Sequence, residues 1–294
     1  MAEIVQVYYR ASTGEEFPFQ MERNVPAGMC GVFREKTVRI KTANFHNWNV
    51  EFETQELDQG ERVLRSFRRG ASYQTQLYIG GPIENRKDLI DTMHAAFERD
   101  VRALTPGRLY WRDYYITCFI MASSTYPDNA AGVTVNDIDI YAAYPYWIKE
   151  EAYSFNMSTD SGAGSGFLDY NIAYQYDFTA DIDSVGTVQN DGTITAPMLI
   201  TFFGPANNPK ISIGGNIYQI NLPVPDGGTG VIDTLHKTVT VTNAAGEVEN
   251  AFNYRRKTGS EFAPIPIGTT EVIWPGDYDV EITVMKERSE PAWT

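Results

Sequence analysis

The hydrophobic and polar positions of this chain follow two different periods. In residues 48–53, Trp48, Val50 and Phe52 alternate with polar residues, and this period of two predicts a strand with one buried face. Val38 and Ile40 repeat the pattern in the preceding segment. We therefore expect strands to dominate the first quarter of the chain.

One segment has the longer period of a helix. Between residues 85 and 104, apolar side chains recur at helical intervals, which predicts an amphipathic helix. Gly80, Gly81 and Pro82 precede this segment, and the Pro-Gly pair at 106–107 follows its end. The predicted buried face consists of Leu89, Ile90, Met93, Phe97, Val101 and Leu104.

After the helix the strand pattern returns. Residues 108–122 predict a hairpin that turns near Arg112 and Asp113, and residues 132–144 predict a further strand. Residues 149–169 are small, polar and rich in Gly and Ser, which indicates a linker or a long exposed loop. We place a domain boundary near residue 150. The expected parts are a β-rich first domain at 1–150, a junction at 151–169 and a second domain at 170–294.

Short strands separated by turn residues fill the second half of the chain. The spacing of the turn signals, about 10 residues, is typical of a sandwich or barrel. Strands are expected within 167–178, 193–203, 210–222, 237–254 and 270–285. The predicted fold class is therefore mainly β with one prominent helix, in two domains.

The charge of the chain narrows the choice of partners. The formal net charge is −14, and residues 151–294 carry 7 basic and 18 acidic side chains against 17 and 20 in residues 1–150. Because the second half of the chain has this excess of acidic side chains, it repels nucleic acid and anionic lipid. No stretch approaches the ~20 apolar residues that a membrane-spanning helix needs. We expect neither specific nucleic-acid binding nor membrane insertion.

The cysteines and histidines offer little chemistry. Cys30 and Cys118 are too few for a disulfide framework or a four-thiolate metal site. The first residues lack the apolar run of a secretion signal. His94 lies beside Met93 on the predicted helix and is interpreted as partly buried, whereas His46 and His236 lie in loops or at strand edges. Neither a G-x-S-x-G nor an H-E-x-x-H motif occurs, so we expect no catalytic residue, no metal, no cofactor and no enzymatic activity.

Two pairs of carboxylates have a spacing that deserves a chemical test. Asp137 and Asp139, and likewise Asp181 and Asp183, lie two residues apart and would share one face of a strand. Such pairs could serve a glycosidase or a calcium site, but the second pair lacks the third oxygen ligand of a calcium loop. We interpret both pairs as solvated surface charge.

A glycine-rich run and an arginine cluster are the remaining polar features. The GAGSG run at 162–166 has no lysine and no following helix, so we interpret it as linker rather than as a phosphate-binding loop. Arg62, Arg65, Arg68 and Arg69 could bind phosphate. We favour a subunit interface, in which these arginines meet acidic groups of a neighbouring subunit.

Exposed tryptophans of a β-sandwich can stack on sugar rings. Trp274 and Trp293 are the two candidates for such a site. We interpret each as a packed core residue, with sugar stacking as the alternative.

The order of these elements resembles one known family. The N-x-G turn at 190–192, Pro197, the strand MLITFFG at 198–204 and the Asn-Pro-Lys-Ile stretch at 208–211 are similar to the second domain of phage distal tail proteins, called Dit proteins, of siphophage tails. Residues 138–151 resemble the closing strand of that family's first domain, with its Pro-aromatic-aromatic pattern at 145–147.

The resemblance implies a structural protein of the virion. Dit proteins form a homohexameric ring at the distal end of the tail tube, in which the first domain makes the ring and a galectin-like second domain projects outward. The implied partners are the tail tube protein, the tail tip or hub protein, the tape measure protein and receptor-binding proteins. The implied location is the distal end of the tail, after synthesis in the host cytoplasm.

Two alternatives remain open at this stage. One is a carbohydrate-binding or adhesin-like module that uses surface aromatics, and a glycoside hydrolase built on the paired carboxylates is a more remote one. Within the ring hypothesis, we expect the helix at 85–104 and the strand at 47–54 to lie at or near the subunit contact, and an assembly unchanged by Phe97→Asp would remove the helix from that role.

Overall fold

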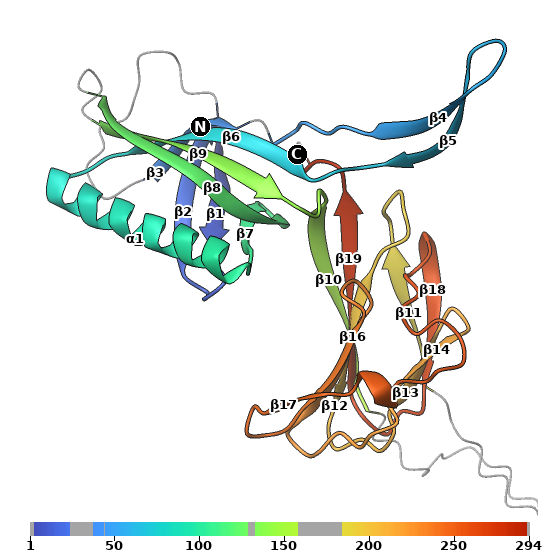
Figure 1. Ribbon diagram of the computed structural model, residues 1–294. Coiled ribbons are helices and arrows are strands. Elements are labelled where there is room, and N and C mark those ends of the chain that lie inside the picture. The colour runs from blue at the N-terminus through green and yellow to red at the C-terminus, as the bar shows by residue number, and fades with distance from the viewer. Residues whose placement is uncertain (1–2, 24–37, 44, 129–132, 158–183, 293–294) are drawn as a thin grey trace, which may run out of the picture. The chain divides into compact units, whose positions relative to one another are not determined.

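The computed structural model describes residues 3–23, 38–43, 45–128, 133–157 and 184–292. The described residues form two compact units (Figure 1). Unit 1 comprises Met1–Lys149 and Arg288–Thr294, and unit 2 comprises Glu150–Glu287. Strands thus make up most of the described chain, with one α-helix, as the sequence predicts.

Seven strands of unit 1 pair into a closed sheet within the chain. The order is β1-β2-β3-β6-β9-β8-β7 and back to β1. Strand β8 makes the closure possible, because its first part pairs with β7 from Tyr114 to Cys118 and its later part pairs with β9 from Phe119 to Asp128. The bounds are β1 Glu3–Arg10, β2 Glu16–Arg23, β3 Val38–Ala43, β6 Ala71–Ile79, β7 Gly107–Trp111, β8 Tyr114–Asp128 and β9 Val133–Ala142.

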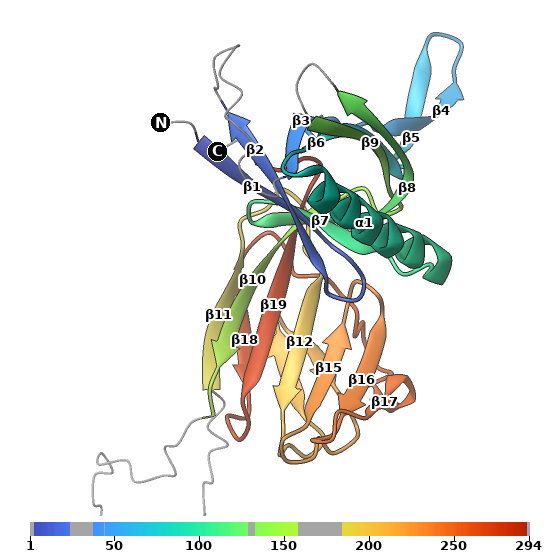
Figure 2. The ribbon, with the colours of Figure 1, turned by 90° about the vertical axis from the view of Figure 1, so that its left-hand side faces the viewer.

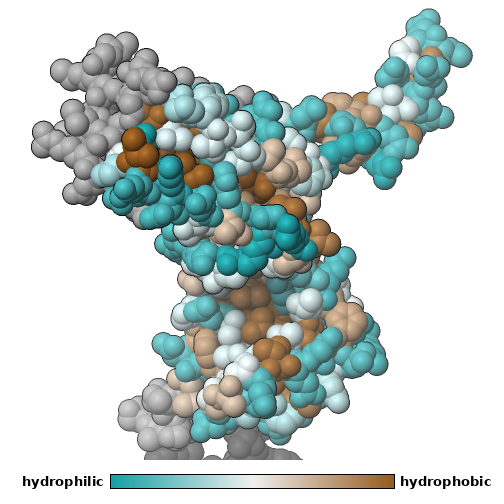
Figure 3. All heavy atoms as spheres, turned by 60° about the vertical axis from the view of Figure 1, so that its left-hand side comes forward, coloured by the Kyte–Doolittle hydropathy of each residue, from teal (hydrophilic) through white to brown (hydrophobic). Residues whose placement is uncertain are grey.

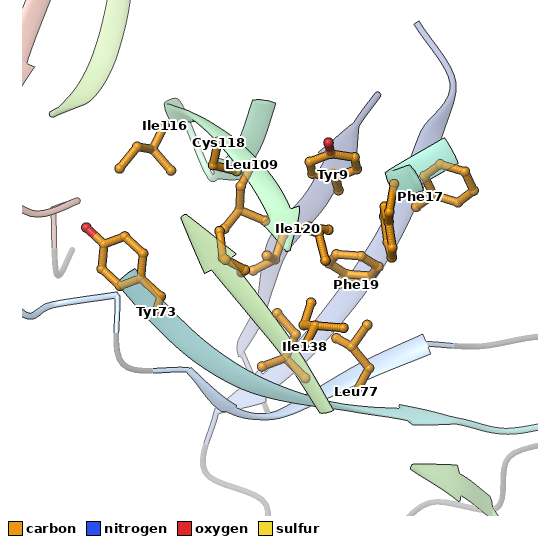
Figure 4. Close-up of a cluster of buried hydrophobic side chains, with 14 of the residues drawn as sticks. Tyr9, Phe17, Phe19, Tyr73, Leu77, Leu109, Ile116, Cys118, Ile120 and Ile138 are labelled. Atoms are coloured by element: carbon orange, nitrogen blue, oxygen red, sulfur yellow. The ribbon is translucent and has the colours of Figure 1, made fainter. Parts of the chain in front are cut away.

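The core of unit 1 is filled by alternate residues of these strands. Tyr9, Phe19, Leu77, Ile116 and Ile138 are almost completely buried, and Figure 4 shows them among the side chains that share one core. This is the pattern that period-two alternation produces when one strand face is turned inward. The predicted hairpin turn at Arg112 and Asp113 is confirmed, since β7 ends at Trp111 and β8 begins at Tyr114.

The helix α1, Ile83–Ala103, packs on this core. Its prediction is confirmed, and Leu104 ends it in the left-handed conformation at φ 52°. The predicted buried face is only partly right. Met93, Ala96 and Phe97 are buried, but Val101 and Leu104 are 37% and 80% exposed.

A charged residue completes the buried face of α1. Asp100 is 0% exposed and accepts hydrogen bonds from the Tyr9 hydroxyl at 2.8 Å and from the hydroxyl and backbone N–H of Ser12. These bonds join the helix to β1 and to the turn that follows it. Burial, together with the negative neighbour Asp100, raises the pKa of Tyr9 above its usual range.

Strands β4, Glu51–Glu56, and β5, Glu61–Phe67, form a separate two-stranded sheet. Figures 1 and 2 show this hairpin standing away from the rest of unit 1. The predicted strand at 48–53 is present only from Glu51 onward, and its predicted buried face is wrong. Trp48 is 54% and Phe52 is 60% exposed, because no other layer of unit 1 covers the hairpin.

Unit 2 consists of two sheets around a second core. One sheet has the order β17-β16-β15-β12-β19-β10 and the other β11-β18-β13-β14. Both contribute to a single hydrophobic cluster that includes Ile200 and Ile282 from the first sheet and Val272 from the second. The bounds are β10 Trp147–Phe155, β11 Ser184–Asn190, β12 Met198–Phe203, β13 Lys210–Ile213, β14 Asn216–Gln219, β15 Thr229–Asp233, β16 Thr238–Thr242, β17 Val248–Asn250, β18 Gly268–Trp274 and β19 Val280–Arg288, with a short 3-10 helix at Phe252–Tyr254.

The structure differs from the predicted domain limits at two places. Residues 151–155 continue strand β10 and are not linker, because side chains such as Tyr153 and Phe155 pack against the core of unit 2. At the other end, Arg288–Thr294 belong to unit 1 and not to the predicted second domain. The predicted strand at 167–178 and most of the predicted junction lie outside the described residues.

Two turn motifs in unit 2 have the conformations that their residues favour. Asn190 is fully buried, donates to the Ile194 carbonyl at 2.9 Å and accepts from the Gly192 N–H at 3.0 Å. The hairpin between β13 and β14 turns through Gly214 and Gly215, whose φ angles of 59° and 81° favour glycine. The N-x-G turn at 190–192 therefore has a structural role, and the segment predicted as strand at 210–222 contains a hairpin turn at Gly214 and Gly215.

An ionic cluster connects the two sheets of unit 2. The ammonium of Lys286 on β19 forms ion pairs with Glu151 on β10 and with Asp191, which follows β11, the latter at 2.6 Å. The hydrogen bond from Lys286 lowers the pKa of Glu151. Burial opposes the charged form of Lys286, but the hydrogen bonds to Asp191 and Glu151 outweigh it and raise the Lys286 pKa.

Replacing Asp100 with Ala should lower the free energy of unfolding by about 3 kcal/mol, because the buried donors of Tyr9 and Ser12 would lose a charged acceptor. The matched control is Asp88→Ala, which removes an exposed carboxylate from the same helix and should change stability by less than about 0.5 kcal/mol. Urea unfolding followed by circular dichroism measures both. Equal effects of the two substitutions would contradict the anchoring role of Asp100.

The Lys286 cluster should make stability fall in acid. Because the Glu151 pKa is lowered in the folded state, its contribution is present above the unfolded value of about 4.3 and is lost as the pH falls through the folded value. Lys286→Met should destabilise by roughly 1–2 kcal/mol at pH 7 and by clearly less at pH 3. Thermal melts at the two pH values test this, and a pH-independent difference would exclude the ionic explanation.

Candidate functional site

The histidines do not form a catalytic arrangement within the described residues. His94 is half-buried, and its Nε2 lies 2.8 Å from the Ser123 hydroxyl and 3.1 Å from the Asn136 amide nitrogen. The Ser123 hydroxyl also donates to the Asn136 Oδ1 at 2.7 Å. Asn136 is fully buried, so this network supplies the partners that its amide needs.

The Ser123–His94 contact therefore has a structural explanation. In a serine nucleophile site, one ring nitrogen faces the serine and the other faces an orienting group. Here Ser123 and Asn136 meet at the same nitrogen of His94. His46 packs edge-on against Trp111, and the exposed His236 is 2.7 Å from Asp233 at a turn. The interpretation of His94 as partly buried is right.

The carboxylates that the sequence singles out do not converge. Asp137 and Asp139 lie on one face of β9, as predicted, and both are half-buried. In the described part of the chain, no group of three His, Cys, Asp or Glu side chains could hold a metal ion. Asp181 and Asp183, like the GAGSG run, lie outside the described residues. The predictions of no catalytic, metal or cofactor residue stay predictions.

Cys118 has the properties of an unreactive core thiol. It is 1% exposed, and burial raises its pKa to about 12. A protonated, inaccessible thiol is neither a nucleophile nor a metal ligand at neutral pH. Cys30 lies outside the described residues.

Trp274 is not a sugar-stacking platform. Only 6% of it is exposed, and its ring lies 5.2 Å from that of Phe155 within the core of unit 2. A stacking site requires an open aromatic face, so the alternative function loses one of its two residues. Trp293 lies outside the described residues.

The arginine cluster lies at the hairpin of β4 and β5, and its partners belong to the same chain. Arg65 forms an ion pair with Glu53, and Arg69 forms one with Glu51 at 2.9 Å. Arg68 packs over the ring of Tyr146, 4.8 Å from its centroid. Arg65 and Arg69 thus already have acidic partners in their own chain, and the prediction that these arginines meet acids of a neighbouring subunit stays a prediction.

Two surface features remain as candidates for binding. The first is the hairpin itself, on which Phe52, Leu57, Val63 and Leu64 are more than half exposed. The second is a groove of about 620 Å³ between α1 and the strands β8 and β9. Phe97 is 4% exposed and packs against Tyr9 and Phe17, so it belongs to the core, while the expectation that the helix lies at or near a subunit contact stays a prediction.

These surfaces belong to a fold that occurs in phage tail assemblies. The structure is similar to the Dit protein of phage SPP1, described as a paradigm of the hub adsorption apparatus in phages infecting Gram-positive hosts. The TM-score is 0.54 and the sequence identity 9%, over 97% of this chain and 100% of that one.

A second match is to the baseplate of phage P2 in its activated conformation with Ca, with a TM-score of 0.61, 10% identity and coverage of 98% of this chain and 100% of the other. The structure of the phage p2 baseplate in its activated conformation with Sr gives a TM-score of 0.60 and 10% sequence identity, over 98% of this chain and 99% of the other. The chain has the fold of these baseplate proteins. No family model and no curated protein matches the sequence.

The likeness to Dit and baseplate structures extends over nearly the whole chain and so includes both units. Two surfaces of unit 1 remain as candidates for binding, the hairpin of β4 and β5 and the groove beside α1. In the described part of the chain, α1 is too polar to span a lipid bilayer.

Replacing Trp274 with Ala should lower the free energy of unfolding by about 3–5 kcal/mol, because it empties a large volume in the core of unit 2. Tyr254→Ala, which removes a 43% exposed aromatic of the same unit, is the control and should cost about 1 kcal/mol or less. Denaturant unfolding measures both. A Trp274 variant with wild-type stability would contradict the core assignment.

Proposed function

We propose that this chain is a structural protein of a phage tail, which forms a ring at the distal end of the tail tube. The observation that carries this proposal is the similarity to Dit and baseplate structures over 97–98% of the chain. A single β-sandwich occurs in proteins of many different functions. A match that includes both units in one chain therefore supports a role in the phage tail more strongly than a match of one unit would.

In this proposal unit 1 forms the ring and unit 2 projects from it. Six copies make a closed homohexamer that joins the tube protein to the tail tip or hub protein. Receptor-binding proteins attach to the ring, and the bore lets DNA and the tape measure protein pass. The excess of acidic side chains is compatible with a conduit that does not hold DNA.

The exposed features of unit 1 support assembly. A cyclic ring needs two different surfaces that fit each other, because each copy meets one neighbour on either side. The hairpin of β4 and β5 and the groove beside α1 are two different exposed surfaces of unit 1. The alternative role in carbohydrate binding has no support from Trp274, which is buried.

The first test is the mass of the purified protein. One chain has a mass of 33.0 kDa, so a hexamer should give about 198 kDa by light scattering and particles with a central hole in negative stain. Because a weak ring can require its neighbour in the tail, the measurement is repeated with the purified tube protein. A mass of 33.0 kDa in both samples, without binding to the tube, would contradict the proposal.

A further inference from the structure

A small polar pocket lies at the base of the hairpin of β4 and β5. Two irregular segments border it, residues 45–50 before β4 and residues 68–70 after β5, and Figure 1 shows them running side by side. The pocket has a volume of about 170 Å³, and most of its lining residues are polar. In Figure 3 the hairpin stands clear of unit 1, with polar and apolar side chains next to one another along it.

One aromatic side chain of this lining is open to solvent. Trp48 is 54% exposed, whereas Trp111, Trp147 and Trp274 are at most 6% exposed. Trp48 is therefore the tryptophan of the described residues with an open ring face. Such a face can stack on the apolar C–H side of a sugar ring, which is the property that the buried Trp274 lacks.

The charged side chains of the pocket are held in place by contacts within the chain. Arg69 forms an ion pair with Glu51 at 2.9 Å, and Arg68 donates from Nε to the Asn49 carbonyl at 3.3 Å. The guanidinium of Arg68 also packs over Tyr146, 4.8 Å from its ring centroid. Because these groups are already positioned, little conformational freedom of the protein is lost when a ligand binds to them.

Amide and hydroxyl groups complete the polar lining. The side chains of Asn47, Asn49 and Ser72 lie on exposed residues, and none of them has a hydrogen-bond partner among the residues that the structure describes. Each amide offers both donors and an acceptor, and the hydroxyl can do either. These side chains are thus available to a ligand that needs donors and acceptors together.

This combination of groups favours a sugar over a simple anion. A sugar hydroxyl both donates and accepts, so it can bond to a guanidinium, a carboxylate and an amide within one pocket. An oxyanion can only accept, and in this pocket it would meet the carboxylate of Glu51. The two guanidinium groups alone would suit phosphate, but Glu51 already neutralises Arg69.

We infer that this pocket binds one neutral sugar residue of a glycan, with Trp48 against the apolar face of the ring and the side chains of Asn49 and Glu51 at its hydroxyls. The site lies in unit 1 and is different from the stacking site considered at Trp274 and Trp293. It goes beyond the proposed tail function, because a ring can assemble whether or not its copies bind a glycan.

Saturation-transfer NMR on the full-length protein tests the site. The probes are four free sugars: glucose, galactose, N-acetylglucosamine and rhamnose. At least one of them should receive magnetisation from the protein, with a Kd on the order of 1 mM, as expected for a small ligand with few contacts. Trp48→Ala should weaken this binding at least about tenfold, because the stacking face is lost.

Two further variants separate the pocket from general effects. Tyr254→Ala removes a 43% exposed aromatic from unit 2 and should leave the sugar signal unchanged. Glu51→Gln keeps the size of the side chain but removes the carboxylate, and it should weaken binding about fivefold. Since Trp48 is more than half exposed, the melting temperature of Trp48→Ala should lie within about 2 °C of that of the wild type, which excludes unfolding as the cause.

Three outcomes would overturn the inference. They are the absence of transfer to all four sugars, a sugar signal that Trp48→Ala leaves unchanged, and binding of inorganic phosphate in calorimetry without any sugar signal. The last outcome would assign the pocket to an anion. If the sugar experiment fails while light scattering gives a ring, only this inference fails, and sugar binding by a chain that forms no ring would leave the inference standing without the proposed function.

Discussion

The closure of unit 1 depends on one long strand that changes its neighbour. Strand β8 pairs with β7 up to Cys118 and with β9 from Phe119 onward, with a register irregularity between Ile120 and Ala122. Closing the strand order satisfies the backbone hydrogen bonds of both outer strands and leaves them no free edge. The alternate residues of all seven strands then share one core, on which α1 packs.

That closed core also explains what is left outside it. The helix buries Met93, Ala96 and Phe97 and ties Asp100 to β1, so its remaining faces are free for other contacts. The hairpin of β4 and β5 is not part of this closed sheet, and Phe52, Leu57, Val63 and Leu64 on it stay exposed. Exposed apolar surface of this kind is typical of proteins that bind a partner there.

Unit 2 is stabilised differently. Its two sheets share an apolar core, and a mostly buried lysine joins them through Glu151 and Asp191. Tyr278 adds a further connection, since its hydroxyl donates to the Lys210 carbonyl at 2.6 Å and burial raises its pKa to about 12. These polar side chains therefore stabilise the packing of the two sheets against each other.

The sequence by itself determined the mainly β fold class, α1, the hairpin at Arg112 and Asp113 and the turn at Asn190, because these depend on local periodicity and backbone preference. Only the tertiary structure decided which apolar residues are buried. Phe52 and Trp274 both lie on strands in which apolar and polar residues alternate. Phe52 is exposed on the hairpin of β4 and β5, whereas Trp274 is packed in the core of unit 2. Periodicity identifies the apolar face of a strand, but burial requires a second layer, and that layer comes from residues far away in the chain.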